Sequence, residues 1–227
     1  MKTYAFIFAR GGSQGVTRKN TRDLAGRPLL AHSIDLARDI DVVDEIYVST
    51  EDQSIARIAV ERGAEVIDRP VELAQDHTPE WLAWQHAVKW LEDRGQGFDV
   101  FLSLPTTAPL RNREDILAAL ERLDVNTDVV LTMTPAARSP WFNMVKKTDD
   151  GLIKLLIENA PPVNRRQDAP LAFDLTTVAY VTRPEFIKSN EGFFQGRVSG
   201  IEIPQERALD IDSELDLHIA NLLMSPN

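Results

Sequence analysis

Residues 4–20 read Tyr-Ala-Phe-Ile-Phe-Ala-Arg-Gly-Gly-Ser-Gln-Gly-Val-Thr-Arg-Lys-Asn, and this stretch decides how the chain is organised. Its first five residues are apolar and partly aromatic, which predicts a buried strand that opens a sheet. Glycines follow at positions 11, 12 and 15, where they allow a sharp turn and let successive backbone N–H groups converge. Arg10, Arg18 and Lys19 add positive charge around that turn, and Pro28 opens a predicted helix. The pattern favours a loop that binds a polyphosphate.

Two familiar phosphate-binding motifs are excluded. The loop has neither the Gly-x-x-x-x-Gly-Lys-Ser/Thr order of a Walker A loop nor the Gly-x-Gly-x-x-Gly order of a dinucleotide site. An ordinary tight turn between a strand and a helix remains an alternative explanation of the glycines. That alternative does not explain the basic residues beside them.

The composition of the chain indicates which kinds of protein and which cellular compartments are compatible with it. A chain of 227 residues that is 43% hydrophobic can bury a full core. The formal charge of −10 argues against a general nucleic-acid binder, and the absence of cysteine excludes disulfides and thiolate metal sites. The N-terminus runs directly into the predicted strand, and no apolar run reaches the ~20 residues of a membrane span. We expect a cytoplasmic protein that binds neither nucleic acid nor a membrane.

Predicted strands and helices alternate along the chain. The strands are expected at 4–8, 45–50, 65–67, 99–102, 128–132, 175–181 and 198–203, and the helices at 28–38, 52–62, 78–92, 113–123 and 213–223. This alternation predicts one Rossmann-like α/β domain over residues 1–227, with three layers and a mainly parallel sheet. Ligands of such sheets bind at the carboxyl ends of the strands. The glycine loop, Ser49-Thr50 and Pro105-Thr106-Thr107 all fall at such ends.

Residues from about 135 to 174 interrupt the alternation. They contain five prolines, several basic residues and one predicted strand at 152–157. We interpret this segment as an excursion from the sheet, a hairpin that covers the substrate or reaches a partner subunit.

The positions of the tryptophan and histidine residues do not indicate a second catalytic or metal site. Trp81, Trp84 and Trp90 lie on one predicted helix at a spacing typical of core packing, with stacking on a base as the alternative. The four histidines have neither metal-ligand nor catalytic-triad spacing. A hydrolase with an activated nucleophile is therefore not supported.

Asp210 and Asp212 lie two residues apart on a predicted extended segment, so their side chains are expected on the same side. Two carboxylates that share a face repel each other unless a cation lies between them, and hard oxygen ligands suit Mg²⁺. The alternative is a structural role, because an aspartate in front of a helix is a common N-cap. The residues alone leave both readings open, with Asp212 or Ser213 as the cap of the last helix.

Six segments in order resemble the acylneuraminate cytidylyltransferases, the enzymes that make CMP-activated sialic acids and related sugar acids. The matching segments are Arg10-Gly11-Gly12-Ser13 with Lys19-Asn20, Val48 to Ala56, Arg69 to Asp76, Leu104 to Arg111, Arg165 to Pro170, and Asp210 to Leu217. The resemblance spans nearly the whole chain. It implies the nucleotide-diphospho-sugar transferase fold, CTP and a nonulosonic sugar acid as substrates, Mg²⁺ as cofactor, and a homodimer.

The resemblance also implies a role for individual residues. It makes Arg10, Lys19, Asp210 and Asp212 catalytic, with Asp210 and Asp212 binding the metal. It assigns nucleotide binding to Ala9, Arg10, Gly11, Gly12, Ser13, Lys19, Asn20, Arg69 and Thr78. It assigns sugar-acid binding to Leu104, Thr106, Arg166, Gln167 and Thr176, with the segment from Trp141 to Asn164 at the dimer interface.

Three positions depart from the family pattern. Gln14 replaces a lysine of the loop, Leu104 replaces a glutamine, and Thr176-Thr177-Val178 replaces Asn-Gly-Ala. Two of the three fall where the family handles the sugar, so we expect CMP transfer to an altered acceptor, such as legionaminic or pseudaminic acid. The alternatives are a non-catalytic binder of nucleotide or sugar acid, and a related nucleotidyltransferase with another nucleotide or acceptor.

Overall fold

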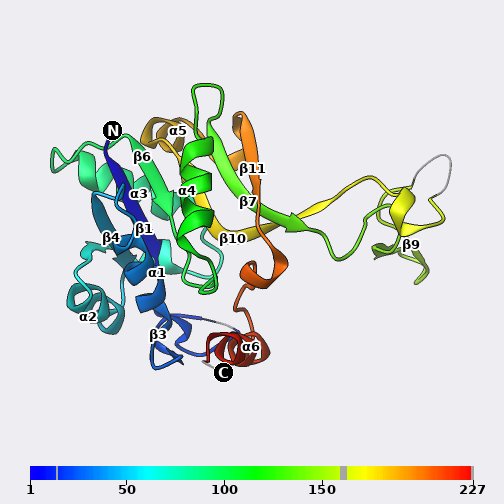
Figure 1. Cartoon of the computed structure of the whole chain (residues 1–227), viewed down its shortest axis with the longest axis horizontal. Coiled ribbons are helices and arrows are strands. Elements are labelled where there is room, and N and C mark those ends of the chain that lie inside the picture. Colours follow the sequence, from blue (N-terminus) through cyan, green and yellow to red (C-terminus); the bar gives the residue numbers. More distant parts are fainter. Residues whose placement is uncertain (14, 159–162, 226–227) are drawn as a thin grey trace.

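Seven strands form one mixed sheet in the order β11-β7-β10-β6-β1-β4-β5 (Figure 1). The computed structural model describes residues 1–13, 15–158 and 163–225. The strands are β1 (Thr3–Phe8), β4 (Glu45–Thr50), β5 (Glu65–Asp68), β6 (Val100–Ser103), β7 (Val129–Pro135), β10 (Phe173–Thr182) and β11 (Val198–Glu202). The predicted strands of the sheet are all present, and their ends differ from the prediction by at most three residues.

Strand direction confirms the expected, mainly parallel sheet. β1 lies at its centre, and Ala5 stands opposite Ile46 of β4 and Leu102 of β6 in parallel register. β5 continues the parallel set beside β4, while β10 runs antiparallel to both β6 and β7. The carboxyl ends of β1, β4, β5 and β6 therefore meet at one edge of the sheet.

Helices cover both faces and complete the three expected layers. The aliphatic face of the sheet packs on α1 (Leu29–Arg38), α2 (Gln53–Glu61) and α4 (Arg113–Arg122), and the aromatic face packs on α3 (Glu80–Glu92) and α5 (Pro184–Ser189). Alternation along β1 divides its side chains between the faces, because Ala5 and Ile7 join the first core while Tyr4 and Phe6 join the second. Trp81 and Trp84 pack in the aromatic core, as their spacing predicts.

Local hydrogen bonds fix where the helices begin. Asp52 caps α2, since its Oδ1 accepts from Ser54 N at 2.7 Å and Ile55 N at 3.0 Å. Ser213 caps α6 (Glu214–Met224) through a capping box with Asp216. The choice between Asp212 and Ser213 as cap is thereby settled, and the Asp212 carboxylate is left for another role.

The remaining short elements connect this framework. They are η1 (Lys19–Thr21), β2 (Asp23–Leu24), β3 (Arg27–Pro28), η2 (Val71–Ala74), η4 (Phe193–Gln195) and η5 (Gln205–Arg207). β2 and β3 form a small hairpin against α6. The helix α3 begins two residues later than predicted, because Pro79 holds an extended conformation in front of it.

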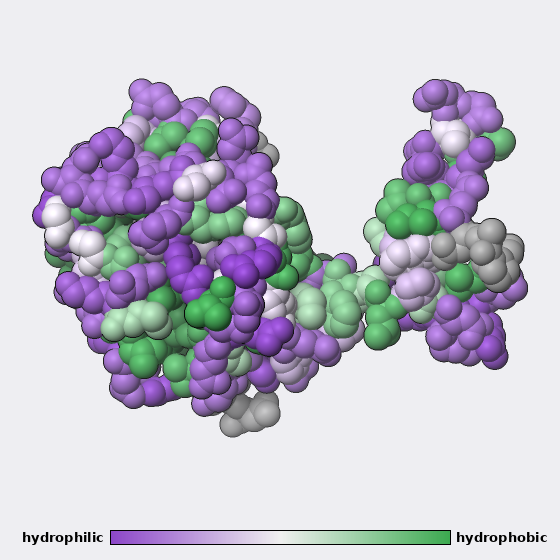
Figure 2. All heavy atoms as spheres, turned by 90° about the horizontal axis from the view of Figure 1, so that it is seen from above, coloured by the Kyte–Doolittle hydropathy of each residue, from purple (hydrophilic) through white to green (hydrophobic). Residues whose placement is uncertain are grey.

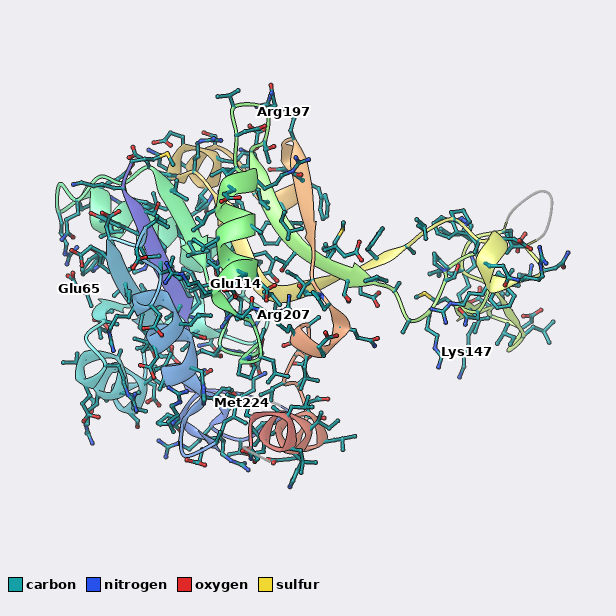
Figure 3. The ribbon with its side chains drawn as sticks, in the orientation of Figure 1. Glu65, Glu114, Lys147, Arg197, Arg207 and Met224 are labelled. Carbon is teal, nitrogen blue, oxygen red and sulfur yellow. The ribbon has the colours of Figure 1, made fainter. Side chains whose placement is uncertain are left out.

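Residues 136–158 and 163–172 leave the sheet as a projecting arm (Figure 1). Its base is marked by a hydrogen bond from Ala136 N to Ala172 O at 2.9 Å. Within the arm, β8 (Val145–Lys147) pairs antiparallel with β9 (Ile153–Leu155), and η3 covers Arg166–Asp168. Figure 3 shows Lys147 on this arm, well away from the sheet. The predicted excursion and its hairpin are present, although the predicted strand at 152–157 is shorter in the structure.

Within the described part of the chain, we found no helix with the length and apolar character needed to cross a membrane.

Candidate active site

The loop that follows β1 is held by one buried asparagine. Asn20 donates from Nδ2 to the carbonyl oxygen of Arg10 at 2.9 Å, and its Oδ1 accepts from Thr106 Oγ1 at 2.6 Å. Both side chains are buried, so this pair joins the glycine loop to the segment after β6 without competition from water. A further bond, from Gly11 N to Glu51 Oε1 at 2.7 Å, ties the same loop to the end of β4.

A cavity of about 380 Å³, here the loop pocket, opens where β1, β5 and β6 end. Its lining residues are Phe8, Arg10, Ser13, Gly15, Lys19, Asn20, Arg69, Leu73, Gln75, Asp76, Thr78, Glu80, Thr106, Thr107 and Asp212. The cavity brings together residues that are far apart in the sequence. Its position agrees with the expectation that a ligand of this sheet binds at the carboxyl ends of the strands.

One side of the loop pocket joins the glycine loop to the segment before α6. Lys19 Nζ donates to the carbonyl oxygen of Ile211 at 2.6 Å and lies 3.3 Å from Asp212 Oδ1. Gly15 approaches the same segment so closely that a Cβ at this position would lie 1.8 Å from the carbonyl oxygen of Asp212. Glycine is therefore required here for space. The contact explains how Lys19 and Asp212, both predicted catalytic residues, come together.

Asp210 lies near Lys19 and Asp212, and its carboxylate is partly desolvated. Burial raises the pKa of Asp210 and the negative charge of Asp212 raises it further, while hydrogen bonds with Thr107 and Thr177 and the charge of Lys19 lower it. Among the described residues, its Oδ1 is buried and has no hydrogen-bond partner. A buried carboxylate oxygen without a partner beside a second carboxylate is suited to a cation.

The donor set fits a divalent metal only in part. No group of three or more His, Asp, Glu or Cys side chains that could hold a metal occurs among residues 1–13, 15–158 and 163–225. Asp210 and Asp212 would therefore supply two hard oxygen ligands, and the rest of the coordination would come from substrate phosphate oxygens and water. This is the usual way in which Mg²⁺ is bound.

The Arg10 guanidinium lines the loop pocket. It forms an ion pair with Asp76 and also donates to the carbonyl oxygen of Ala74 at 3.4 Å. Both partners are partly exposed, with 32% and 53% of their side chains accessible. Because exposed ion pairs contribute little, an incoming phosphate can compete with Asp76 for this arginine.

The loop pocket is also lined by Arg69, a buried arginine immediately after β5. Its Nε donates to Ser49 Oγ at 3.1 Å and its Nη2 donates to Ser49 O at 2.6 Å. The guanidinium stacks over Phe8 at 5.5 Å from the ring centroid. Burial lowers the pKa of Arg69, whereas the charges of Glu51 and Glu80 raise it. The result is a fixed donor group beside an aromatic ring.

A second cavity of about 400 Å³, the aromatic pocket, adjoins the loop pocket. It is lined by Phe8, Pro79, Glu80, Trp81, Trp84, Pro105, Thr106, Thr107, Thr177, Tyr180, Glu191, Gly192 and Phe193. Phe193 stacks on Tyr180 with ring centroids 5.2 Å apart and meets Trp81 edge-on at 5.4 Å. The two pockets share Phe8, Glu80, Thr106 and Thr107. Two ligands, one in each pocket, would therefore meet at this common wall.

A buried arginine supports that common wall from behind. Arg111 donates to the carbonyl oxygens of Val178, at 2.6 Å, and of Pro105, and to Ser33 Oγ at 2.5 Å. Burial lowers the pKa of Arg111 to about 9. Arg111 thus joins the loop after β6 to β10.

Eight of the sixteen predicted site residues line the loop pocket. Arg10, Ser13, Lys19, Asn20, Arg69, Thr78, Thr106 and Asp212 line it. Ala9 and Gly11 instead support the loop, since their amides donate to Ser49 O and Glu51 Oε1. Gly12 is exposed, and Gln14 lies outside the described residues.

Four predicted sugar-binding residues do not line either pocket. Leu104 is completely buried in the aliphatic core, because its side chain follows the inward alternation of β6. Thr176 is also buried and donates from Oγ1 to Thr132 Oγ1 at 2.7 Å; the β10 register shift after it separates it from Tyr180 of the aromatic pocket. Arg166 and Gln167 lie exposed on the arm. These four residues therefore lie away from the walls of both pockets, and their assignment to the sugar acid stays a prediction.

The sequence analysis missed the aromatic pocket. Trp81 and Trp84 have the spacing of core residues, and they do pack in the core while one surface of each lines the cavity. Tyr180 and Phe193 come from separate segments and carry no motif. Glu80, at the start of α3, lines both pockets and carries no motif that would single it out in the sequence.

Comparisons with known proteins agree with this arrangement. A family model described as cytidylyltransferase matches residues 4–197. The flagellin modification protein B of Campylobacter coli is 34% identical over 222 residues, covering 96% of this chain and 93% of that protein. A CMP-N,N'-diacetyllegionaminic acid synthase of Campylobacter jejuni is also 34% identical, over 96% and 93% of the two chains. In fold, the chain is similar to a CMP:2-keto-3-deoxy-manno-octonic acid synthetase complexed with CTP, with a TM-score of 0.69, 17% identity, and coverage of 99% and 98%.

Proposed function

The chain belongs to the cytidylyltransferase family, and from this premise we propose that it transfers CMP from CTP to a nonulosonic sugar acid and releases pyrophosphate. In this reaction a sugar hydroxyl oxygen forms a bond to the α-phosphorus of CTP. The bond from that phosphorus to the oxygen bridging to the β-phosphorus breaks, pyrophosphate leaves, and the hydroxyl proton passes to solvent. Transfers of this type depend on positioning and on neutralising charge.

The wall shared by the two pockets carries this proposal. The loop pocket offers cationic side chains and a carboxylate, as a nucleoside triphosphate and its metal require, while the aromatic pocket offers an enclosed apolar surface. CTP in the first and a sugar acid in the second would bring phosphorus and hydroxyl together beside Thr106 and Thr107. Holding two reactants in contact supplies a large part of the rate enhancement in such reactions.

Individual residues then have separate tasks. Arg10 and Lys19 bind the triphosphate and stabilise the negative charge that develops on the leaving pyrophosphate. Asn20 and Thr106 hold the glycine loop in position. Asp210 and Asp212 would hold Mg²⁺, which supplies charge neutralisation at the phosphate oxygens when it is bound.

We propose an acceptor of the legionaminic type over N-acylneuraminate. The relative named for N,N'-diacetyllegionaminic acid is 34% identical over 96% of this chain. Its substrate has two acetamido groups, whose methyl groups suit the apolar walls formed by Trp81, Tyr180 and Phe193. CTP as donor also favours the cytoplasm as the compartment of the reaction.

The test is pyrophosphate release with Mg²⁺ over a grid of the four nucleoside triphosphates and several nonulosonic acids, including N-acylneuraminate. We expect release with CTP and a diacylated acid. Release with N-acylneuraminate alone would overturn the acceptor assignment. If no combination releases pyrophosphate while CTP still binds, the result would favour the non-catalytic binder.

We further propose that the arm forms a homodimer. Apolar side chains on it and at its base are exposed, among them Val145, Leu152, Ile153, Leu171 and Phe173. Figure 2 shows this apolar surface on the arm and on the narrow neck that joins it to the body. A second copy could cover the arm, and Arg166 and Gln167 would then contribute to the partner's aromatic pocket.

Light scattering across micromolar concentrations tests the dimer. Ile153→Glu should give a monomer, whereas Val60→Glu, which alters an equally exposed valine on α2, should not. A wild-type monomer at every concentration would remove the proposal.

A further inference from the structure

We propose that Asp115 and Arg207 are positioning residues, which act together as a clamp on the two carboxylates of the candidate metal site. The clamp holds the segment that carries Asp210 and Asp212 against the loop that follows β6. The inference rests on the proposed function, because these carboxylates serve the CTP and Mg²⁺ of that reaction. Neither Asp115 nor Arg207 lines the loop pocket or the aromatic pocket, so neither is expected to touch a substrate.

The clamp is a bidentate ion pair between two elements that are far apart in the sequence. Arg207 of η5 donates from Nε to Asp115 Oδ2 and from Nη2 to Asp115 Oδ1, both at 2.9 Å. A guanidinium that binds both oxygens of a carboxylate fixes the direction of its partner as well as its distance. Asp115 is only 5% exposed, so the loss of Arg207 would leave a buried charge without compensation.

The Asp115 end of the clamp is fixed to the loop after β6. Asp115 lies in the first turn of α4, where its Oδ2 accepts from Asn112 N at 3.1 Å and its own N donates to Asn112 Oδ1 at 3.0 Å. Arg111, the residue before this capping box, donates to the carbonyl oxygen of Pro105. The carboxylate of Asp115 is therefore a fixed point at the end of the loop that carries Thr106 and Thr107.

The Arg207 end of the clamp lies in the connection between β11 and α6. Ile203 N donates to the carbonyl oxygen of Met133 at 2.7 Å, and Ile211 N donates to the carbonyl oxygen of Thr107 at 2.9 Å. Arg207 lies midway between these two attachments. The clamp is thus a further point of attachment, immediately before the residues that carry the two carboxylates.

The two ends of the clamp meet again at the candidate metal site. Asp210 forms hydrogen bonds with Thr107 and Thr177, which lower its pKa against the effect of burial. Burial lowers the pKa of Arg111, while the charges of Asp115 and Asp210 raise it, so both carboxylates lie close enough to act on this arginine. A shift of η5 would therefore move Asp210 relative to Thr107 and to the buried charge of Arg111.

A contribution to stability alone is the competing explanation, and the chain contains a matched pair that tests it. Arg197 donates from Nε to Asp128 Oδ2 at 3.0 Å and from Nη2 to Asp128 Oδ1 at 2.9 Å. This pair joins the residues just before β7 and β11. Figure 3 shows Arg197 and Arg207 at opposite ends of β11. The Arg197 pair has the same geometry as the clamp but lies away from both pockets.

The first experiment compares Arg207→Gln with Arg197→Gln. Dissociation constants for CTP are measured by calorimetry, without acceptor, in Mn²⁺ and in EDTA, since Mn²⁺ prefers the same oxygen ligands as Mg²⁺. The ratio of the two constants reports the contribution of the metal. We expect this ratio to fall about tenfold in Arg207→Gln, with an unchanged constant in EDTA, and to stay at the wild-type value in Arg197→Gln.

Three outcomes of this experiment would overturn the clamp. They are a wild-type affinity for CTP that does not respond to Mn²⁺, an unchanged ratio in Arg207→Gln, and equal losses of the ratio in both variants. Arg207→Lys retains the charge and loses the bidentate geometry, so we expect an intermediate ratio. Thermal unfolding compares the stability of the variants, and Arg207→Lys replaces Arg207→Gln if the latter does not fold.

The second experiment tests whether the two residues act as one unit. Asp115→Asn keeps an oxygen that can accept from Asn112 N, but it removes the charge that Arg207 binds. We expect Asp115→Asn to lower the Mn²⁺ ratio as Arg207→Gln does, and the double variant to lose no more than either single variant. Losses that add in the double variant would contradict a shared role.

The two proposals fail separately. An effect of Mn²⁺ on CTP binding that depends on Arg207, without pyrophosphate release on any sugar acid, would support the clamp and contradict the transferase. Pyrophosphate release by Arg207→Gln with the Mg²⁺ dependence of the wild type would support the transferase and overturn the clamp.

Discussion

The loop pocket and the aromatic pocket differ in how their walls are held. Side chains of the loop pocket are fixed by hydrogen bonds and ion pairs that cross the sequence, such as Lys19 to Ile211 and Asn20 to Thr106. Side chains of the aromatic pocket are fixed by ring contacts within a core, such as Trp84 with Phe101 at 4.8 Å. Directional hydrogen bonds hold charged groups at the fixed positions that stabilisation of developing charge requires, whereas ring packing determines the shape of a cavity. We infer that the first pocket determines the chemistry and the second determines which acceptor is used.

The largest effect is expected for Asp212→Ala. The change removes the carboxylate that lies beside Lys19, so the Mg²⁺ proposed for this site and the triphosphate would lose a common partner. We expect pyrophosphate release to fall about a thousandfold, in the range found when one electrostatic contact to a transition state is removed.

The matched control is Glu206→Ala, an exposed acid on η5 in the same connecting segment, which should leave the rate unchanged. Circular dichroism should show both variants folded. Near-normal turnover of Asp212→Ala at limiting Mg²⁺ would contradict the metal role.

Gly15→Ala should give the next largest effect. A Cβ at this position would lie 1.8 Å from the Asp212 carbonyl oxygen, so the loop or the segment before α6 must shift. We expect kcat/KM to fall about a hundredfold, since a displacement of ~1 Å in a site can have that effect.

Gly12→Ala provides a sharp comparison, because nothing lies within 4 Å of a Cβ added there. It should retain nearly full activity. Equal losses in both variants would show that the loop responds to any added side chain.

Phe193→Ala tests the aromatic pocket alone. It removes the ring that stacks on Tyr180, so we expect the KM for the sugar acid to rise about tenfold, as loss of a buried aromatic contact predicts. The dissociation constant for CTP should not change. Phe194→Ala alters the adjacent ring, which is 72% exposed and does not line the pocket, and should change neither constant. A weaker affinity for CTP in Phe193→Ala would mean that the two pockets are not separable.

The smallest effect is expected for Asp76→Asn. The substitution weakens the ion pair that a phosphate must displace from Arg10, so CTP should bind up to about fivefold more tightly. Calorimetry at low salt measures the difference, which should shrink as salt screens the pair. Weaker binding of CTP would show that Asp76 positions Arg10 for the nucleotide.

Several features could be predicted from sequence because they depend on local patterns. Asp52 lies directly before an apolar helical repeat and caps α2 at the start of the predicted helix over 52–62, and the apolar run before the glycines forms β1. Lys19 follows β1 and Asp212 precedes α6. Both segments lie at the same edge of the sheet, so the two side chains meet at the loop pocket.

Other features could not be predicted, because they depend on tertiary packing. Leu104 was expected to face the sugar, but one step of strand alternation directs it into the core. Phe193 and Tyr180 lie in different elements and pair only after β10 and η4 pack on α3. The direction in which the arm projects could not be predicted either. Apolar residues of its hairpin, such as Val145 and Ile153, are exposed, so the hydrophobic pattern does not indicate where the arm lies.

The bond between Lys19 and Ile211 has a consequence for synthesis of the protein. Its two residues are 192 positions apart, and Gly15 and Asp212 approach each other over a similar separation. At translation rates of 5–20 residues per second, the partner of Lys19 is made about 10–40 s after it. A nascent chain can therefore pair β1 with β4 long before it can complete the loop pocket. Until then, Lys19 carries its positive charge without Ile211 and Asp212, and a nucleotide bound at that stage would act as a folding template.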